Sequence, residues 1–268
     1  MNKTLKAAIA AVVLAGAASG ARADLTYQGA VGLPLNPTAQ IPQPGGIRLQ
    51  ANYFDQGDID AGGANIGDVR DMSIVAAGRV AGQIELNGGY KKFRVRESGL
   101  VPANSLDPLD ESGFVIGAKY LFSRESDPVG VRIAAGVGHD RATLRNTHAY
   151  VVGTKYLGAL VEGRVPTTVH LGLRYDRFRL PALPLIGGAS DSSSKVSVYG
   201  GVEFPVADSF ALVGELQSKN IDGGKIPYSA SVRFRPQGQP FAASIGIARQ
   251  GITGDNGLFA QLGYTFGG

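Results

Sequence analysis

The stretch Leu258-Phe-Ala-Gln-Leu-Gly-Tyr-Thr-Phe266 decides the fold class, because its residues alternate between two faces. Every second residue is apolar or aromatic, and the residues between them include Gln261 and Thr265. A period of two is typical of a β-strand with one apolar face. We expect this strand to be the last of a sheet and to close it. The closing residues are then Leu258, Leu262, Tyr264 and Phe266.

The same alternation recurs along the chain from Ile47 onward, in about twelve runs of about 8–12 residues each. Clear examples are Phe114–Phe122, Thr167–Phe178 and Tyr228–Arg235. A tilted strand of this length crosses the hydrocarbon of a bilayer. An open sheet edge would leave backbone amides unpaired in lipid. The sequence therefore predicts an all-β fold, an antiparallel transmembrane β-barrel of about 12 strands. A secreted, soluble β-sandwich is the competing fold, because antiparallel sheets with one apolar face occur there too.

The links between the runs alternate in length. Ala81–Gln83 and Pro205–Ser209 are short, whereas Gln56–Arg70, Arg96–Ser112 and Arg179–Ser194 are long. Transmembrane barrels have short periplasmic turns and longer outer loops. This arrangement places both ends of the chain in the periplasm.

Residues 1–23 have the three parts of a secretory signal peptide. Lys3 and Lys6 are basic, Ala7–Gly16 is a short apolar run, and Ala21-Arg22-Ala23 is a small-x-small cleavage site. We expect export, cleavage of this signal peptide and residence in the bacterial outer membrane.

Residues 24–45 form a Pro/Gly-rich segment that precedes the barrel at 46–268. The segment does not alternate, and its prolines exclude a central strand. Leu33, Leu35 and Ile41 favour burial. Two interpretations stay open, a plug folded into the barrel entrance or lumen and a periplasmic tail without a fixed position.

Charge excludes one class of function. The chain has 26 basic and 22 acidic residues, and the signal peptide holds three of the basic ones. The remainder has 26 − 3 = 23 basic residues, a net charge of +1. No basic stripe is left for a nucleic-acid backbone, so nucleic acid is not an expected partner. The chain also lacks cysteine, which excludes disulfides and a lipoprotein anchor.

Charged residues that alternate with the apolar ones should face the lumen, because Arg or Lys at the bilayer midplane costs about 2–4 kcal/mol. In the sixth strand we place Tyr150, Val152 and Tyr156 outward. The predicted inward acids are Glu85, Glu203 and Glu215. The predicted inward bases are Arg48, Arg79, Lys119, Arg132, Lys155, Arg174, Arg233 and Arg235.

This excess of bases has two interpretations. A ring of positive charge would favour anions in a narrow pore. Alternatively, buried Arg–Glu pairs would brace an interior filled by side chains, since about twelve strands lie between filled and open barrels.

Signals for catalysis are weak. The chain has no Gly-x-Ser-x-Gly motif, and no fixed spacing brings a serine to His139, His148 or His170. His139 and His148 flank one predicted outer loop, so they could meet at the rim. We predict no catalytic residue, no metal site and no cofactor; an outer-membrane hydrolase is the least favoured function.

Leu258–Phe266 is similar to the C-terminal signature of Gram-negative outer-membrane barrels, which the barrel-assembly machinery recognises. This chain departs from it by adding Gly267 and Gly268. The segment Gly32-Leu-Pro-Leu-Asn-Pro-Thr-Ala39 with Pro44-Gly-Gly-Ile-Arg-Leu49 resembles the start of YjbH-like barrels. That resemblance implies an association with exopolysaccharide production.

The sequence therefore favours a non-enzymatic, narrow porin-like channel with a basic lumen. The alternative is an accessory barrel for exopolysaccharide export or a surface scaffold. The expected partners are outer-membrane lipid, lipopolysaccharide, the barrel-assembly machinery, and small anionic solutes or exopolysaccharide.

Overall fold

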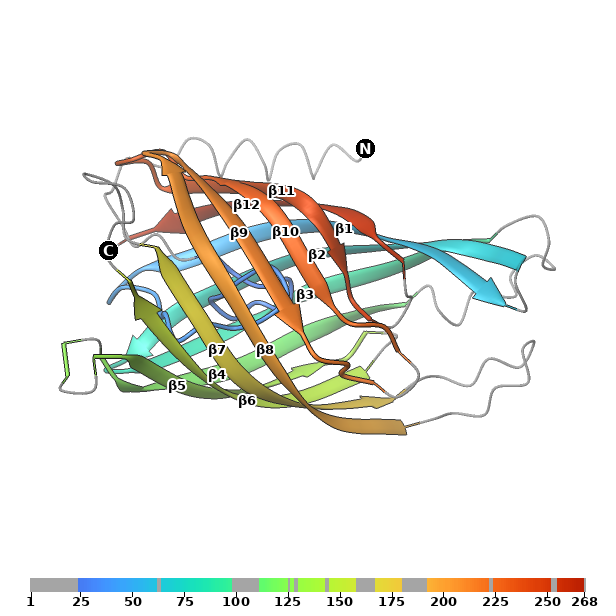
Figure 1. The fold of residues 1–268 in the computed structure, drawn as a ribbon, viewed down its shortest axis with the longest axis horizontal. Coiled ribbons are helices and arrows are strands. Elements are labelled where there is room, and N and C mark those ends of the chain that lie inside the picture. Colours follow the sequence, from blue (N-terminus) through green and yellow to red (C-terminus); the bar gives the residue numbers. More distant parts are fainter. Residues whose placement is uncertain are drawn as a thin grey trace.

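Twelve antiparallel strands close into one barrel (Figure 1). A computed structural model describes residues 24–61, 64–97, 111–124, 126–127, 130–142, 145–157, 167–179, 192–221, 224–251 and 255–267. The strands are β1 Ile47–Ala61, β2 Ala64–Ala81, β3 Ile84–Glu97, β4 Ser112–Ser123, β5 Arg132–Asp140, β6 Arg145–Tyr156, β7 Thr168–Arg179, β8 Ser192–Ala207, β9 Phe210–Gln217, β10 Tyr228–Phe234, β11 Phe241–Arg249 and β12 Gly257–Phe266. Within the described ranges, no helix is long and apolar enough to cross a bilayer.

The barrel closes where the last strand meets the first. β12 pairs with β1 from Ile47↔Phe266 to Phe54↔Phe259 without a break in register. Each strand has two hydrogen-bonded neighbours, so the sheet has no open edge. This closure confirms the predicted antiparallel twelve-stranded barrel.

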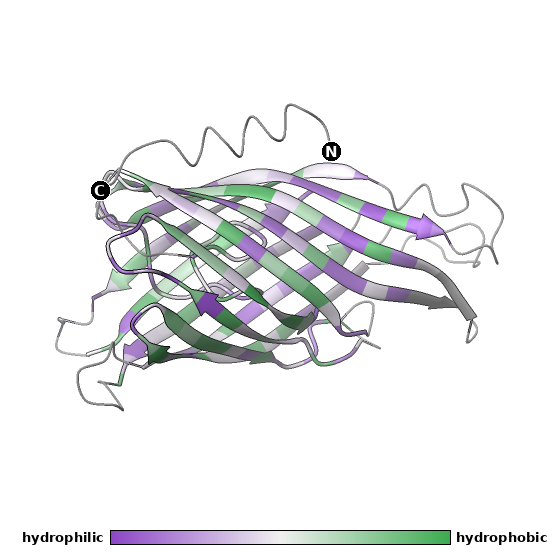
Figure 2. Ribbon diagram, turned by 90° about the horizontal axis from the view of Figure 1, so that it is seen from above, coloured by the Kyte–Doolittle hydropathy of each residue, from purple (hydrophilic) through white to green (hydrophobic). Residues whose placement is uncertain are grey.

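Large apolar side chains cover the outside of the wall. Leu171, Ile245 and Leu258 are 67%, 64% and 63% exposed. The residues that alternate with them are largely polar, so the strands change colour along their length in Figure 2. An outer face of this kind is suited to lipid, because a water-soluble protein exposes few large apolar patches.

The two ends of the barrel differ as the sequence predicts. β2 and β3 are joined only by residues 82–83, and β8 and β9 only by 208–209, at the end where the C-terminus lies (Figure 1). At the opposite end, β1 and β2 continue pairing to Ala61↔Ala64. The predicted loop Gln56–Arg70 is therefore wrong over its described residues, because they form a two-stranded ribbon. This stretch carries no regular apolar face, so the alternation did not mark it.

Two glycines on the inner wall make room for tyrosine rings on the neighbouring strand. Gly136 lies opposite Tyr150, and Gly172 lies opposite Tyr199. A Cβ on Gly136 would lie 2.4 Å from the Tyr150 hydroxyl, and one on Gly172 would lie 2.4 Å from the Tyr199 ring. The missing side chains let both rings lie across the inside of the wall. Glycine in a strand commonly marks such a close approach.

Candidate functional site

The N-terminal segment, residues 24–45, lies inside the barrel instead of in its wall (Figure 1). From Asp24 to Ala39 every residue except Tyr27 is buried, and the segment becomes exposed only at 43–45, just before β1. The prolines that keep this segment out of the sheet are compatible with a coiled path in the lumen. The barrel interior and this segment together form the candidate site.

Within the segment, the chain folds back on itself twice. Thr26 N donates to Ala30 O at 2.7 Å, and Leu33 N donates to Asn36 O at 2.9 Å. Gly32 lies at the crossing, where a Cβ would be 2.4 Å from Asn36 O. These turns satisfy some backbone groups internally. The others require partners on the wall, because buried backbone groups are rarely left unpaired.

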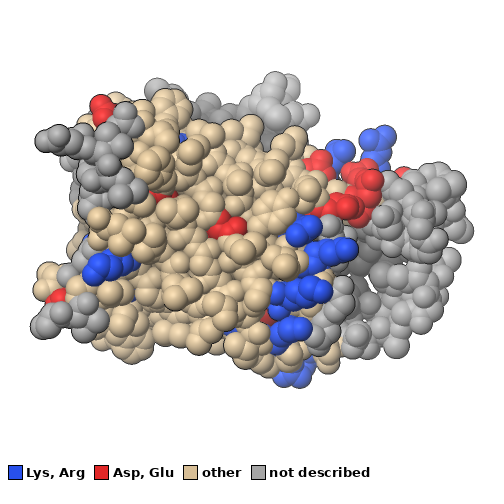
Figure 3. Space-filling view, viewed as in Figure 1, with Lys and Arg blue, Asp and Glu red and all other residues tan. Residues whose placement is uncertain are grey.

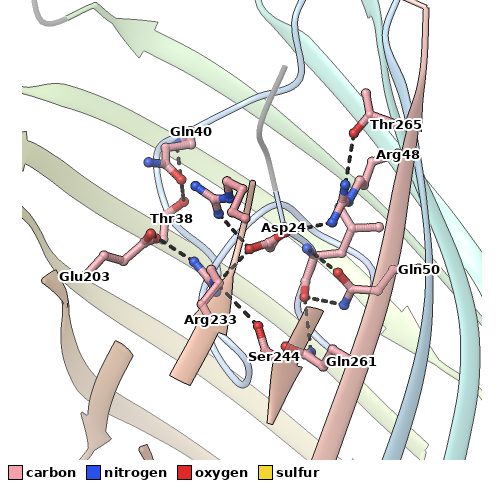
Figure 4. A network of polar contacts seen from close by, with 12 residues as sticks. Asp24, Thr38, Gln40, Arg48, Gln50, Glu203, Arg233, Ser244, Gln261 and Thr265 are labelled. Carbon is pink, nitrogen blue, oxygen red and sulfur yellow. Dashed lines mark hydrogen bonds and ion pairs between the residues drawn. The ribbon is translucent and has the colours of Figure 1, made fainter. Parts of the chain in front are cut away.

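Asp24 makes the ion pairs that hold the start of the segment to the wall. Its carboxylate is buried and accepts from Arg48 Nη2 at 2.8 Å, from Arg233 Nε at 2.6 Å and from Arg235 Nη2 at 2.6 Å. Arg48 lies on β1, Arg233 on β10 and Arg235 just after β10. Figure 4 shows Arg48 and Arg233 pointing toward Asp24 from different strands. One carboxylate therefore links three guanidinium groups inside the barrel.

The three arginines have more N–H donors than the Asp24 carboxylate can accept. Glu203 accepts one further donor, because its Oε2 lies 2.9 Å from Arg233 Nη1. Arg48 Nε, Arg233 Nη2 and Arg235 Nε are buried without a hydrogen-bond partner. Three arginines against two carboxylates also leave a net positive charge. This cluster, Arg48, Arg233 and Arg235, is called the arginine cluster below.

The arginine cluster controls the ionisation of Asp24. Burial alone would raise the pKa of the Asp24 carboxyl, but the charges of Arg235, Arg233 and Arg48 together outweigh burial. The pKa of Asp24 therefore lies well below its ordinary value of 3.8. Asp24 is therefore a negatively charged carboxylate at neutral pH.

Glu85 and Lys119 form a buried pair that also holds the segment. Lys119 Nζ lies 2.8 Å from Glu85 Oε2, and both side chains are fully buried. Glu85 Oε1 accepts from Val31 N at 3.0 Å. Lys119 Nζ donates to Val31 O at 3.0 Å and to Thr38 O at 3.2 Å. A charge pair on β3 and β4 thus binds the backbone of the segment on both its donor and acceptor sides.

On the opposite wall, Glu215 of β9 accepts two adjacent backbone amides. Leu35 N lies 2.7 Å from Glu215 Oε1, and Asn36 N lies 3.0 Å from Oε2. Ala39 N donates to Thr154 Oγ1 at 2.9 Å, and the Tyr199 hydroxyl donates to Pro37 O at 3.0 Å. Side chains of the wall therefore replace the backbone partners that the segment lacks.

Apolar contacts supplement these polar ones. Leu25 and Val31 pack with Val75, Ala77 and Val115 of the wall. Leu35 packs with Phe54, Ala248 and Phe259. Two cavities beside the segment have volumes of about 10 and 30 Å³, which is room for one or two water molecules each.

The structure places the sequence-predicted lumen residues as follows. Arg48, Lys119, Arg174, Arg233, Glu85, Glu203 and Glu215 are buried inside the barrel. Arg79 is half-buried beside Pro44 at the rim and donates to Gly82 O. Arg132 is half-buried and lies against the Tyr156 ring, 5.1 Å from its centroid.

The prediction for the sixth strand is wrong. Tyr150 and Val152 are buried, whereas Val151 is 43% exposed. Lys155 is exposed and donates to Gly130 O at the rim. The even-numbered residues of β6 therefore face the interior, so Lys155 faces outward. Tyr150 and Val152 are apolar for a different reason from the one assumed, because they pack with Ala39 of the segment.

Sequence reasoning also missed several inward charges. Lys91 Nζ lies 2.9 Å from Asp71 Oδ2 and 3.0 Å from Asp140 Oδ2. Arg174 Nε lies 2.9 Å from Asp176 Oδ1. All these groups are buried. With Asp71, Asp140 and Asp176 included, the described interior holds more buried acids than buried bases, so the predicted excess of inward bases is wrong for the lumen as a whole and holds only locally, at the arginine cluster. Asp140 is the last residue of β5, whereas Asp71 and Asp176 lie within β2 and β7.

The histidines do not form a common site. His139 shares the outward face of β5 with Val137, and its Nδ1 lies 2.9 Å from Thr147 Oγ1. His148 is buried on the inner face of β6. His170 is also buried, and its Nδ1 lies 2.9 Å from Thr154 Oγ1. The wall separates His139 from His148, although both flank the same loop. Among the described residues, no group of acids and histidines could hold a metal ion.

No family model and no curated protein matches the chain. Solved structures do match it over most of its length. The chain resembles a KdgM porin with 11% identity and a TM-score of 0.53, over 82% of this chain and 99% of that one. The fold is that of an outer-membrane β-barrel. A structure described as KdgM porin in complex with disordered oligogalacturonate matches with 10% identity and a TM-score of 0.50, over 82% of this chain and 99% of that one. A NanC porin matches with 8% identity and a TM-score of 0.50, over 83% of this chain and 99% of that one. None of these three is a YjbH-like barrel, so that resemblance stays a prediction.

Proposed function

We propose that this protein is an outer-membrane channel for small anionic solutes and that its N-terminal segment occupies the conducting path. The twelve-stranded porin fold supports a channel. The neighbouring KdgM structure is described as a complex with oligogalacturonate, and an acidic solute of that chemical class is consistent with arginines in the lumen of this chain.

The observation that carries the proposal is the binding of Asp24 by the arginine cluster. Guanidinium groups bind carboxylates well because their donors match the geometry of the two oxygens. Asp24 is covalently attached to the protein, so it acts as a tethered anion. When it leaves, the same three arginines present a carboxylate-sized anion site. The buried donors that Asp24 leaves unfilled add to the attraction.

The construction of the segment favours displacement. It enters the wall only at its C-terminal end, where β1 begins at Ile47. Its contacts with Glu85 and Lys119 are made by its backbone, and its contacts with Glu215 by two backbone amides and the Asn36 side chain. Water can replace such contacts once the segment moves, because all the wall groups concerned are polar or charged. We also propose export with signal cleavage before Asp24; residues 1–23 lie outside the described residues.

Planar-bilayer recording tests the channel. The full mature chain is compared with a variant that lacks residues 24–40, under a salt gradient. We expect small or infrequent current steps from the full chain. The shortened variant should give larger and steadier steps, with a reversal potential that indicates anion preference. Heat-modifiable migration on gels serves as the control that both barrels are folded.

Two outcomes would overturn the proposal. The first is the absence of current steps from both proteins over the full voltage range. The second is a cation preference in the shortened variant. The alternative role in exopolysaccharide export and recognition by the barrel-assembly machinery stay predictions.

A further inference from the structure

Basic side chains form a row on the outside of the barrel, at the end remote from the C-terminus. They occupy the same outward positions as the exposed apolar residues of their strands, which for β7 are Leu171, Leu173 and Tyr175. Figure 3 shows Lys and Arg gathered at this end of the visible face, whereas the middle of the wall is almost free of charge. This row is called the basic belt, and its members are Arg70, Lys92, Arg94, Arg96, Arg141, Arg145, Arg177 and Arg179.

The belt follows neighbouring strands around half of the barrel, with a gap at β4, where the exposed residue before the strand is the acid Glu111. Its residues lie on β2, β3, β6 and β7 and directly after β5. These strands are consecutive neighbours in the sheet, with β4 between β3 and β5. On the other half, the described bases at this end include Arg249 at the end of β11, which is engaged by Ile226 O at 2.9 Å and by the Tyr228 ring, and Lys219 and Lys225, which are exposed in the link between β9 and β10. The arginine-rich row on the strands themselves is therefore concentrated on the half formed by β2–β7.

Two pairs of belt residues face each other across neighbouring strands. Arg70 lies opposite Arg94, and Arg145 lies opposite Arg179. Like charges in directly opposite positions destabilise a sheet. Among the described residues, Asp68 lies 3.2 Å from Arg70, but neither Arg145 nor Arg179 forms an ion pair with a described carboxylate. A partner that supplies negative charge from outside would remove this repulsion.

The position of the belt indicates which surroundings supply that charge. Met72 follows Arg70 on the outward face of β2 and is 42% exposed, and Tyr175 precedes Arg177 on β7 and is also 42% exposed. The belt therefore begins where the apolar band ends. This is the level of the lipid headgroups in the leaflet next to the long loops. Seven of the eight belt residues are arginines, which bind phosphate through paired donors.

We propose that the basic belt binds phosphorylated headgroups of outer-leaflet lipid, the phosphates of lipopolysaccharide. The opposed pair Arg145 and Arg179 holds one phosphate between its guanidinium groups. The apolar side chains below contact the acyl chains of the same lipid. Lipid of this kind then coats the half of the barrel formed by β2–β7. The inference does not depend on whether the barrel conducts.

Thermal unfolding in lipid vesicles tests the proposal. The full mature chain is reconstituted into phosphatidylcholine vesicles with and without phosphorylated lipid A, and the unfolding midpoint is read from heat-modifiable migration. The belt variant carries Arg94→Gln, Arg96→Gln, Arg177→Gln and Arg179→Gln. The matched control removes the same charge from exposed positions off the belt, two at the opposite end of the barrel, Arg124→Gln and Lys155→Gln, and two at the same end on the other half, Lys219→Gln and Lys225→Gln.

We expect lipid A to raise the midpoint of the wild type and of the control, and to leave the midpoint of the belt variant unchanged. Lipid A from which the phosphates have been removed should have no effect on any of them. If the belt variant does not fold, replacing the same four arginines with lysine keeps the charge, and this second variant should retain part of the rise.

Three results would overturn the proposal. The first is a lipid A effect on the unfolding midpoint of the belt variant that equals the effect on the wild type. If the belt variant does not fold, the corresponding result is a lysine variant whose midpoint lipid A does not raise. Another is an equal rise with dephosphorylated lipid A. The third is the same rise with inorganic phosphate alone, which would indicate a general anion effect instead of lipid binding.

Discussion

Asp24 and Arg233 join the start of the N-terminal segment to β10, with Asp24 Oδ2 lying 2.6 Å from Arg233 Nε inside the barrel. Both side chains are buried, so the contact is shielded from salt and water. Arg48 and Arg235 reinforce it from two further positions. This shared carboxylate makes Asp24 the charged anchor of the segment.

Replacing Asp24 with asparagine should release the segment. Asp24→Asn keeps the shape but removes the anion shared by the buried Arg48 and Arg233 and the half-buried Arg235, and loss of one partner from a buried ion pair costs about 3–5 kcal/mol. We expect a higher open probability in planar bilayers and faster cleavage of the segment by added protease. Asp208→Asn, at an exposed turn, is the matched control and should behave like the wild type. An unchanged open probability in Asp24→Asn would contradict the anchoring role.

The anchoring by Asp24 should resist moderate acid. The arginines lower the pKa of Asp24 below its ordinary value of 3.8, so the free segment takes up a proton before the bound one does. The contribution of Asp24 to holding the segment is therefore complete above 3.8 and declines as the pH falls from there toward the lower pKa of the bound state.

This pH dependence is measured as the difference in open probability between wild type and Asp24→Asn. The difference should be constant from neutral pH down to the ordinary value of 3.8 and should shrink below it. Using the difference removes the effects of the other buried acids, which both proteins share. A difference that declines already near neutral pH would show that the carboxylate is not held by the arginines.

Replacing one partner of the Glu85–Lys119 pair should destabilise the barrel more than replacing both. Lys119→Met leaves Glu85 buried without its partner, and we expect it to lower the free energy of unfolding by about 3–5 kcal/mol. The double variant Lys119→Met with Glu85→Gln should recover much of that loss, because no charge stays unpaired. Urea unfolding in detergent, followed by gel migration, measures the free energy of unfolding of the single and the double variant. Equal losses in the single and double variants would exclude a direct interaction between the two groups.

Ion selectivity should distinguish Lys155 from Arg235. Arg235 belongs to the arginine cluster, so Arg235→Gln should weaken the anion preference measured in the variant that lacks residues 24–40. Lys155 faces outward, so Lys155→Gln in the same background should leave the reversal potential unchanged. A shift of the reversal potential in Lys155→Gln would indicate that Lys155 faces the lumen and would contradict the orientation of β6.

The wall of the barrel could be predicted from the sequence because lipid imposes one apolar face on most strands. Leu171 and Leu173 on β7, and Leu258 and Leu262 on β12, are exposed as the alternation indicates. The pattern failed on β6, where Tyr150 and Val152 are apolar because they pack inside against the segment. An interior that is partly apolar removes the contrast on which the alternation depends.

The contacts of the segment could not be predicted in the same way. Glu85, Lys119 and Glu215 could be placed in the lumen, but their partners are largely backbone groups of residues 31–38. Backbone groups are the same in every sequence, so no residue pattern indicates this pairing. Asp24 was recognisable only as the first residue after a predicted cleavage site, and nothing in its neighbourhood pointed to the arginines of β1 and β10.

A reversible tether between the segment and the wall tests the central claim most directly. Ala39 N lies 2.9 Å from Thr154 Oγ1, and the chain has no cysteine of its own. Ala39→Cys combined with Thr154→Cys should form a disulfide that fixes the segment in the lumen, with each single variant as a control. We predict that the oxidised double variant is silent in planar bilayers and that adding reductant restores current steps like those of the wild type. Identical currents before and after reduction of a confirmed disulfide would contradict the claim that the segment occupies the conducting path.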